Sequence, residues 1–261
     1  MITSAQNPKI QWLRRLQRDR RQRAEDRVFV VEGVRLAEEA LKSGWQAQLV
    51  IFSEDLNERG RSVVEGFRAQ GAQVEPVKES VLRSASDTQT PQGLAAVIAW
   101  RVLPLPSQPD FLFIPARVRD PGNLGAMLRT AAAAGVQAAL IPPETSDAFA
   151  PKTLRAGMGA HFRLPILNLD YPGVASYLEG FQVCLAAAGQ GVRYTQVDFR
   201  RPSALVIGGE ADGASPQISQ LATCRVNIPM PGGGESLNAA VAAGILLFEA
   251  ARQRILPQDP A

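Results

Sequence analysis

Short apolar runs and longer amphipathic stretches alternate along the first hundred residues, which predicts alternating β-strands and α-helices. Runs rich in aliphatic and β-branched residues predict strands at residues 27–31, 48–52 and 94–102, and one more after a turn at 71–74. Apolar residues at helical spacing predict helices from Asn7-Pro8 onward, over 33–44 and over 56–70. The first helix begins with an N-cap residue and then proline at the first helical position.

Residues 103–110 (LPLPSQPD) contain three prolines in eight positions, so they cannot form a helix and are typical of a linker. We therefore expect a first domain over 1–103, a linker over 104–110 and a second domain over 111–261. In the second domain the pattern predicts strands at 111–115, 138–141, 163–167, 181–187, 205–208 and 225–228, and helices at 124–134, 152–158, 174–178 and 237–254. Strands separated by helices predict an α/β fold with a mostly parallel sheet covered on both faces.

The net charge of +3 is unevenly distributed along the chain. Residues 1–27 contain eight basic and three acidic residues, so this segment carries +5 and the remainder about −2. Such segregation favours a polyanionic partner, and the alternative is a solvated helix face. The candidate contacts to such a partner are Arg14, Arg18, Arg20, Arg21 and Arg23.

Composition also limits the class of protein. Cys184 and Cys224 are isolated, which predicts reduced thiols in a cytoplasmic protein. No apolar leader follows the polar start, and the apolar run 239–248 is too short to span a bilayer, so we expect neither a signal peptide nor a membrane partner. With a single histidine, His161, which we interpret as a packing or surface residue, no metal site is expected.

Three glycine-bearing stretches each follow a predicted strand, at residues 119–136, 204–215 and 228–244. Ligands of open α/β sheets bind at the carboxyl ends of the strands, so the three stretches should converge on one site. Neither a P-loop nor a dinucleotide fingerprint is present, and no histidine or cysteine is near enough for triad hydrolysis. The polar groups available for chemistry are Asn123, Arg129, Glu210, Ser236 and Asn238. Arg129 interrupts an alanine-rich segment that should be buried, so we expect it to have an anionic or carbonyl partner.

The stretches DPGNLGAMLRTAAAAGV, VIGGEADGAS and IPMPGGGESLNAAVAAGILLFEA resemble the three motifs of the SpoU (TrmH-type) RNA ribose 2′-O-methyltransferases of the SPOUT class. The segments FVVEGVRLAEEAL and TPQGLAAV resemble the L30e-like RNA-binding domain of the same family. The resemblance implies a small N-terminal L30e-like α/β domain and a C-terminal SPOUT domain with a deep trefoil knot. It also implies S-adenosylmethionine as cofactor, structured ribosomal or transfer RNA but no DNA as partner, and a homodimer.

The resemblance also implies roles for individual residues. The cofactor would be bound by Gly208, Gly209, Glu210, Ile228, Met230, Ser236, Leu237 and Asn238. The catalytic residues would be Asn123, Arg129, Glu210, Ser236 and Asn238. The arginine has been proposed as general base in the family, but a free guanidinium stays protonated at neutral pH. Gripping the target phosphate and polarising the hydroxyl is an alternative role for Arg129, with Glu210 orienting Asn123 or Arg129.

The sequence departs from the family at Gly209, where asparagine is usual, and at Ala239 and Ala240, where Val-Ser is frequent. Because Gly209 removes an amide next to Glu210, a catalytically silent RNA-binding or ribosome-assembly protein remains an alternative. A Rossmann-type methyltransferase of small molecules is a third hypothesis. It is disfavoured because the early glycine-rich loop of that class is missing.

Overall fold

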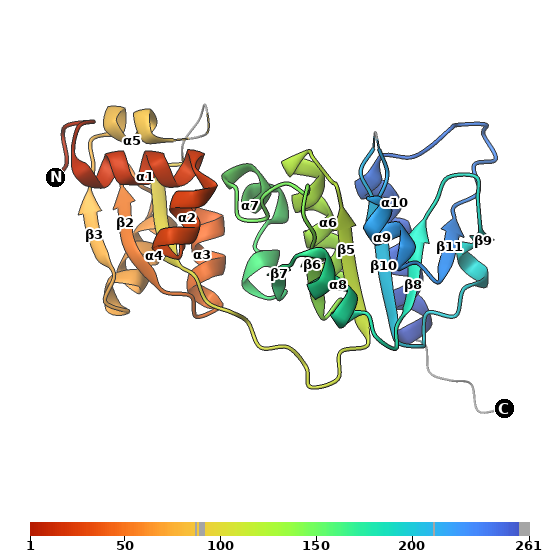
Figure 1. The fold of residues 1–261 in the computed structure, drawn as a ribbon. Helices are drawn as coiled ribbons and strands as arrows, with labels where there is room; N and C mark the ends of the chain where they lie inside the picture. The colour runs from red at the N-terminus through yellow and green to blue at the C-terminus, as the bar shows by residue number, and fades with distance from the viewer. Residues whose placement is uncertain (87, 89–91, 211, 256–261) are drawn as a thin grey trace. The chain divides into compact units, whose positions relative to one another are not determined.

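The computed structural model describes residues 1–86, 88, 92–210 and 212–255, which form two compact units (Figure 1). The first unit comprises Met1–Val102 and Phe149–Phe162, and the second comprises Leu103–Ala148 and the described part of Arg163–Ala261. The sequence analysis places Phe149–Phe162 in the second domain, whereas these residues pack with the first unit. The predicted linear boundaries at residues 103 and 111 stay a prediction.

The first unit contains a mixed sheet with strand order β1-β4-β2-β3. Its strands are β1 (Val28–Glu32), β2 (Ala47–Phe52), β3 (Gln73–Pro76) and β4 (Leu94–Ala99). β4 runs antiparallel to β1 and β2, and β3 runs parallel to β2. The carboxyl ends of β1, β2 and β3 therefore lie at the edge where β4 begins. Of the segment TPQGLAAV, Thr90 and Pro91 lie outside the described residues, and Leu94–Val97 belongs to β4.

The helices of the first unit are α1 (Pro8–Arg18), α2 (Arg20–Asp26), α3 (Val34–Lys42), α4 (Glu58–Ala69), α5 (Glu79–Ala85) and α7 (Pro151–Gly157), with a 3₁₀ turn at Ala160–Phe162. The sequence predicts one N-terminal helix, but the chain forms two. Asp19 between them is extended (φ −111°, ψ 111°), and its carboxylate caps α2 by accepting from the backbone N–H of Arg21 at 2.8 Å. The interruption turns Arg23 inward, where it is 4% exposed and donates to the carbonyl of Leu16.

Aromatic packing explains why Phe149–Phe162 joins the first unit. The Phe29 ring lies 5.6 Å from the Trp45 ring and 5.1 Å from the Phe149 ring, centroid to centroid. The Trp45 Nε1 donates to the carbonyl of Phe162 at 3.2 Å. His161 is buried and packs edge-on against Phe149, with ring centroids 5.6 Å apart. Burial of these large rings stabilises the packing of residues 149–162 in the first unit, and the local sequence pattern does not reveal such long-range contacts.

The second unit contains a seven-stranded sheet with order β7-β6-β5-β10-β8-β11-β9, and every pairing in it is parallel. The strands are β5 (Phe111–Ala116), β6 (Ala138–Ile141), β7 (Ile166–Asn168), β8 (Gln182–Ala186), β9 (Val192–Arg193), β10 (Ser203–Gly208) and β11 (Cys224–Asn227). The helices are α6 (Pro121–Ala133), α8 (Tyr171–Tyr177), α9 (Pro216–Gln220) and α10 (Ala239–Ile255), with a 3₁₀ turn at Tyr194–Gln196. The predicted parallel α/β sheet is confirmed, and the trefoil knot stays a prediction.

The two faces of this sheet are buried by different helices. Leu112, Ile114 and Val206 share a core cluster with Val174 of α8 and Ile218 of α9. α10 contacts both α6 and β10, and α6 contacts β5 (Figure 1). Alternate strand residues point to opposite faces of the sheet. Because helices cover both faces, nearly every residue of β5 and β10 is buried.

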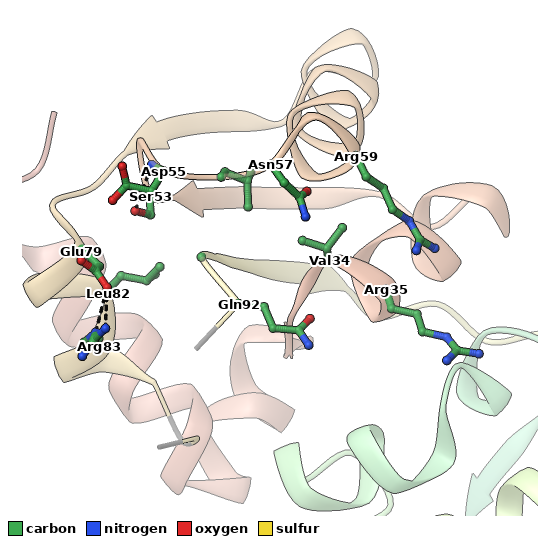
Figure 2. Close-up of a pocket in the computed structure, with 12 residues that line it drawn as sticks. Val34, Arg35, Ser53, Asp55, Asn57, Arg59, Glu79, Leu82, Arg83 and Gln92 are labelled. Atoms are coloured by element: carbon green, nitrogen blue, oxygen red, sulfur yellow. Dashed lines mark hydrogen bonds and ion pairs between the residues drawn. The ribbon is translucent and has the colours of Figure 1, made fainter. Parts of the chain in front are cut away.

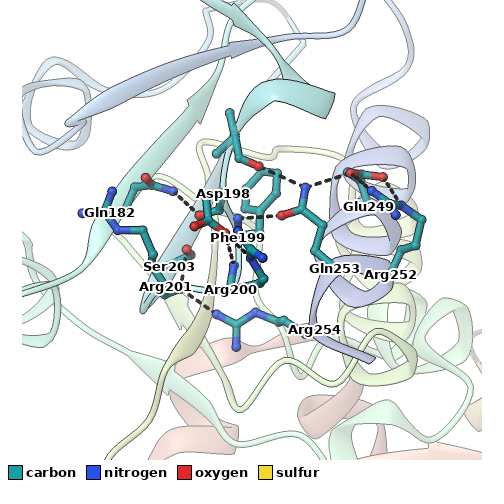
Figure 3. A network of polar contacts seen from close by, with 11 residues as sticks. Gln182, Asp198, Phe199, Arg200, Arg201, Ser203, Glu249, Arg252, Gln253 and Arg254 are labelled. Carbon is teal, nitrogen blue, oxygen red and sulfur yellow. Dashed lines mark hydrogen bonds and ion pairs between the residues drawn. The ribbon is translucent and has the colours of Figure 1, made fainter. Parts of the chain in front are cut away.

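The C-terminal half of α10 is anchored by side-chain hydrogen bonds to the segments ahead of β5 and β10, the second of which is drawn in Figure 3. Gln253 accepts from the backbone N–H of Phe199 at 2.9 Å and donates to Glu249 at 2.8 Å. Arg254 donates to the carboxylate of Asp110 at 3.0 Å and to the carbonyl of Arg201 at 2.8 Å. This anchoring fixes the helix whose first residues belong to the third glycine-bearing stretch.

Candidate active site

Two neighbouring strands bring the first two glycine-bearing stretches to one edge of the second sheet. β5 and β10 pair with Ala116 opposite Gly208 at their carboxyl ends. α6 starts after β5, and its N-cap Asp120 accepts from the backbone N–H of Asn123 at 2.8 Å. The third stretch leads into α10, which lies against α6 and β10. The three stretches therefore meet at the strand ends, where the topology predicts a ligand site.

Three of the predicted catalytic residues, one from each stretch, form a hydrogen-bonded cluster. Glu210 Oε1 accepts from the side-chain amide of Asn123 and, at 3.0 Å, from that of Asn238. The Asn238 amide also lies 3.3 Å from Asn123 Oδ1. The Asn238 Oδ1 accepts from the backbone N–H of Ala240 at 2.9 Å, at the start of α10. Each side chain thereby fixes the orientation of the others, and the cluster as a whole can present hydrogen-bonding groups to a ligand.

A cavity of about 580 Å³ opens beside this cluster. All eight residues that the resemblance assigns to the cofactor line it, including Ser236, for which the described residues offer no hydrogen-bond partner. Part of its wall is formed by Ala186, the last residue of β8, and by Ala187 and Ala188 after it, which the sequence analysis did not single out. Small apolar residues at the end of a strand form no recognisable sequence motif, so their place at the site follows only from the order of the strands in the sheet.

The glycines of the second stretch are required by close backbone contacts. A Cβ on Gly208 would lie 2.5 Å from the backbone nitrogen of Ala214, and a Cβ on Gly209 would lie 2.2 Å from the carbonyl oxygen of Arg117. The N–H of Gly209 donates to the carbonyl of Ala116 at 2.9 Å. Gly209 therefore allows the backbone ahead of Glu210 to lie directly on the end of β5. In this chain the close approach leaves no room for a side chain at position 209.

The comparison with known families decides the identity of this site. Residues 110–248 match the model of the SpoU rRNA Methylase family. The chain belongs to this family. Residues 7–96 match a second family model, described as the MRM3-like substrate binding domain.

Relatives of the SpoU family resemble the chain over nearly its full length. The 23S rRNA (guanosine(2553)-2′-O)-methyltransferase RlmP of Bacillus subtilis is 33% identical, over 95% of this chain and 97% of that protein. The crystal structure of an AdoMet-bound rRNA methyltransferase from Sinorhizobium meliloti superposes with a TM-score of 0.86 at 32% identity, covering 98% of each chain. The AdoMet complex of AviRb from Streptomyces viridochromogenes gives a TM-score of 0.84 at 28% identity, covering 95% of this chain and 99% of that one.

Arg117 connects three strand ends around the SpoU site, and the sequence analysis missed it. Its backbone is left-handed (φ 57°) directly after β5, and its side chain is 19% exposed. The guanidinium forms ion pairs with Glu144 after β6, at 3.1 Å, and with Asp212 after β10, at 3.2 Å. Because Asp212 is two residues from Glu210, this pairing restrains the loop that carries the glutamate. The signal is a non-glycine residue with positive φ, and it is visible only in the structure.

Arg129 is exposed on α6, so the expectation that the segment around it is buried is wrong at this position, and an anionic or carbonyl partner stays a prediction. Among the described residues it has no hydrogen bond or ion pair with the rest of the chain. A helix of 3.6 residues per turn rotates by about 240° over six residues, so Arg129 and Asn123 face different directions. The alanine-rich segment misled the prediction, because small residues also occupy the exposed side of α6.

The predicted RNA-contacting arginines divide into three groups. Arg18, Arg20 and Arg21 are exposed, whereas Arg14 is half-buried and donates from Nε to the carbonyl of Ser84 at 2.9 Å. Arg23 is buried, so its assignment to the RNA-binding surface is corrected. The break at Asp19 changes the helical phase, which is why a single-helix pattern misplaced Arg23.

Proposed function

We propose that the chain transfers a methyl group from S-adenosylmethionine to a ribose 2′-hydroxyl of structured ribosomal RNA. Its membership of the SpoU family makes it an RNA methyltransferase that uses S-adenosylmethionine. The observation that carries the proposal is the cavity at the strand ends, whose wall contains residues of the Asn123–Glu210–Asn238 cluster and every residue assigned to the cofactor. Ribosomal rather than transfer RNA is favoured because RlmP and a relative from Streptomyces viridochromogenes are both named for 23S rRNA.

The residues present fit S-adenosylmethionine. The cavity volume of about 580 Å³ lies in the range of roughly 300–1,000 Å³ typical of small-molecule sites. Glycine backbone at Gly208 offers exposed main-chain groups, while Ile228 and Leu237 supply apolar walls for an adenine ring. When bound, the cofactor supplies an electrophilic methyl group on a sulfonium that leaves readily. Displacement at such a carbon mainly requires alignment of the incoming oxygen.

The chain's own residues would provide that alignment. Glu210 lines the cavity and accepts a hydrogen bond from the Asn123 amide, which restrains the rotation of Asn123 beside it. The Ser236 hydroxyl is available to a bound ligand at the same cavity. Arg129 would grip the target phosphate and polarise the ribose hydroxyl, since its guanidinium is exposed and has no described partner.

A homodimer would bring Arg129 of one copy to the site of the other. Val241 and Phe248, seven residues apart on one side of α10, are each 52% exposed, and Ile255 continues the row. An exposed apolar row of this kind is typical of a protein interface. α10 packs on α6, which carries Arg129, so a second copy seated on α10 would lie next to that guanidinium. Arg129 and Asn123 face different directions on α6 of one chain, which supports a site that combines residues of two copies.

We place the protein in the cytoplasm, in keeping with its reduced thiols. Cys184 and Cys224 lie opposite each other on β8 and β11 and are both free. Burial, together with the neighbouring Cys224, raises the pKa of the Cys184 thiol to about 12, so it stays protonated at neutral pH. Among the described residues, no helix has both the length and the apolar character needed to cross a bilayer.

The alternative of a catalytically silent RNA-binding protein loses its motivation. That alternative rests on the missing amide at Gly209, where the Arg117 carbonyl leaves no room for a side chain. Glu210 is still held by two amide groups.

Two measurements on the purified chain test the proposed function. Calorimetry should show binding of S-adenosylmethionine and no binding of ATP or NAD. Tritium from labelled S-adenosylmethionine should then appear at a ribose 2′-oxygen of 23S rRNA that lacks the modification. Tight ATP binding without S-adenosylmethionine binding would contradict the proposal.

A further inference from the structure

A cavity of about 600 Å³ lies entirely within the first unit (Figure 2). It opens at the sheet edge where β1 and β2 end and β4 begins, and its lining comes from α3, the β2–α4 loop, the start of α4, α5 and the residues ahead of β4. Its volume falls within the roughly 300–1,000 Å³ of small-molecule sites. The methyl-transfer chemistry uses none of these residues, and Val34, Arg35, Gln92 and Gly93 belong to the two segments that resemble the family's RNA-binding domain.

The floor of this cavity is apolar and its rim is rich in hydrogen-bonding groups. Val34, Leu56 and Leu82 are buried side chains in the lining. The amides of Asn57 and Gln92 lie at the rim, where both residues are exposed (Figure 2). An apolar surface flanked by amide groups suits a planar heterocycle with polar edges, which describes a nucleobase.

Ser53 provides a buried hydrogen-bond donor in the lining. The residue is 3% exposed, and its Oγ accepts from the backbone N–H of Asp55 at 3.4 Å. Its hydroxyl proton has no acceptor among the residues that the structure describes. A buried donor without an acceptor costs free energy, so a ligand that accepts this proton would be stabilised.

The charged residues of the cavity leave one guanidinium without a counter-ion. Arg83 pairs with Glu79 at 2.6 Å, and Arg59 pairs with Glu38. Arg35 forms no hydrogen bond or ion pair with any described residue. Figure 2 shows Arg35 and Arg59 on one side of the cavity, and the carboxylate of Asp55 and the Arg83–Glu79 pair on the other. An unpaired guanidinium beside a cavity favours a phosphate, which it can bind through two parallel hydrogen bonds.

We propose that this cavity binds one unstacked nucleotide of the RNA substrate. The base would lie on the Val34–Leu56–Leu82 floor and accept the Ser53 proton, and its phosphate would pair with Arg35. Sequence-specific RNA recognition relies on such unstacked bases in loops and bulges. The inference rests on the proposed function, because it assigns a part of the RNA substrate to the first unit.

Nucleotide binding to the full chain tests this directly. The chain is saturated with S-adenosylhomocysteine, so that the cofactor cavity is filled, and uridine or adenosine 5′-monophosphate is added while backbone amide NMR signals are followed. Saturable shifts should appear at Val34, Arg35 and Ser53. Arg35→Gln should weaken binding about tenfold or more, because a charge-assisted hydrogen bond contributes roughly 1.5–3 kcal/mol. Arg68→Gln is the matched control: it removes the same charge from an exposed side chain of α4 that does not line the cavity.

Binding of purified 23S rRNA provides the second readout. Arg35→Gln should lower the affinity and reduce the slope of log K against log salt by about 0.7 to 0.9, whereas Arg68→Gln should change neither. Shifts confined to other residues, or wild-type rRNA affinity and slope in Arg35→Gln, would overturn the inference. Normal methyl transfer without shifts in the cavity would remove this site and leave the proposed function intact. Shifts in the cavity of a chain that transfers no methyl group would support the site and contradict the proposed function.

Discussion

Gly209→Ala tests whether close backbone packing around Glu210 positions the catalytic cluster. The added Cβ would lie 2.2 Å from the carbonyl oxygen of Arg117, whereas real Cβ atoms essentially never approach another atom below 3.0 Å. The loop must therefore move by at least about 0.8 Å, since the carbonyl belongs to the backbone at the end of a buried strand. Glu210 is the next residue and would move with it, away from the amides of Asn123 and Asn238.

The size of the effect follows from this displacement. A misplacement of about 1 Å in an aligned site costs on the order of 10²-fold in rate, so turnover should fall by about that factor. The steric conflict should also destabilise the second unit by about 1–3 kcal/mol, which corresponds to roughly 2–4 °C in Tm for each kcal/mol. Initial rates of tritium transfer to 23S rRNA, with thermal unfolding of the same samples, measure both quantities.

Gly232→Ala is the matched control in the third glycine-bearing stretch. A Cβ on Gly232 would meet no atom within 4 Å, and its φ does not lie in the left-handed region. Turnover and Tm of Gly232→Ala should therefore stay close to wild type. If Gly209→Ala also kept wild-type turnover and Tm, the conclusion that backbone packing fixes Glu210 would be refuted.

Three further predictions follow from exposed and paired charges. Arg129→Ala should lower turnover by about 10²-fold or more while Tm and S-adenosylmethionine affinity stay unchanged. Arg129→Lys should not restore turnover, because an ammonium group lacks the planar fork of a guanidinium. Near-normal turnover of Arg129→Ala would remove Arg129 from the site. Changing Arg18, Arg20 and Arg21 to Gln should reduce the salt slope of rRNA binding by about 0.7 to 0.9 for each phosphate that the protein no longer neutralises. An unchanged slope would mean that these arginines serve solubility alone. The hydrogen-bonded guanidinium of Arg252 holds the pKa of Glu249 below its ordinary 4.5, so this carboxylate stabilises the fold above pH 4.5 and ceases to do so as the pH falls further. Glu249→Gln should therefore lower Tm at pH 7 and flatten its decline between about pH 5 and 3, and parallel Tm curves for both proteins would contradict this.

The order of strands and helices was predictable because local patterns carry it. The predicted strand at 138–141 coincides with β6, and a parallel sheet followed from helices between the strands. α5 was missed, since it is a short helix of seven residues without a long apolar period. The break between α1 and α2 was also not predicted, because Asp19, whose carboxylate caps α2, lies in a run of charged residues and does not stand out from them.

The parts of the site that depend on tertiary packing could not be predicted. The motif residues Asn123, Glu210 and Asn238 were found from their sequence context, and the structure joins them by hydrogen bonds. The left-handed backbone of Arg117 and its ion pairs arise only when three strand ends meet. The exposure of Arg129 depends on which side of α6 faces the sheet, and an alanine-rich helix does not encode that side clearly.

Mapping of 2′-O-methylated riboses in ribosomal RNA tests the central claim most directly. RNA is compared from cells with the gene, without it, and without it but supplied with either the wild-type gene or the Glu210→Gln variant. We expect a ribose methylation that disappears with the gene, returns with the wild-type copy and does not return with Glu210→Gln. Identical methylation of ribosomal RNA in all of these strains would contradict the account.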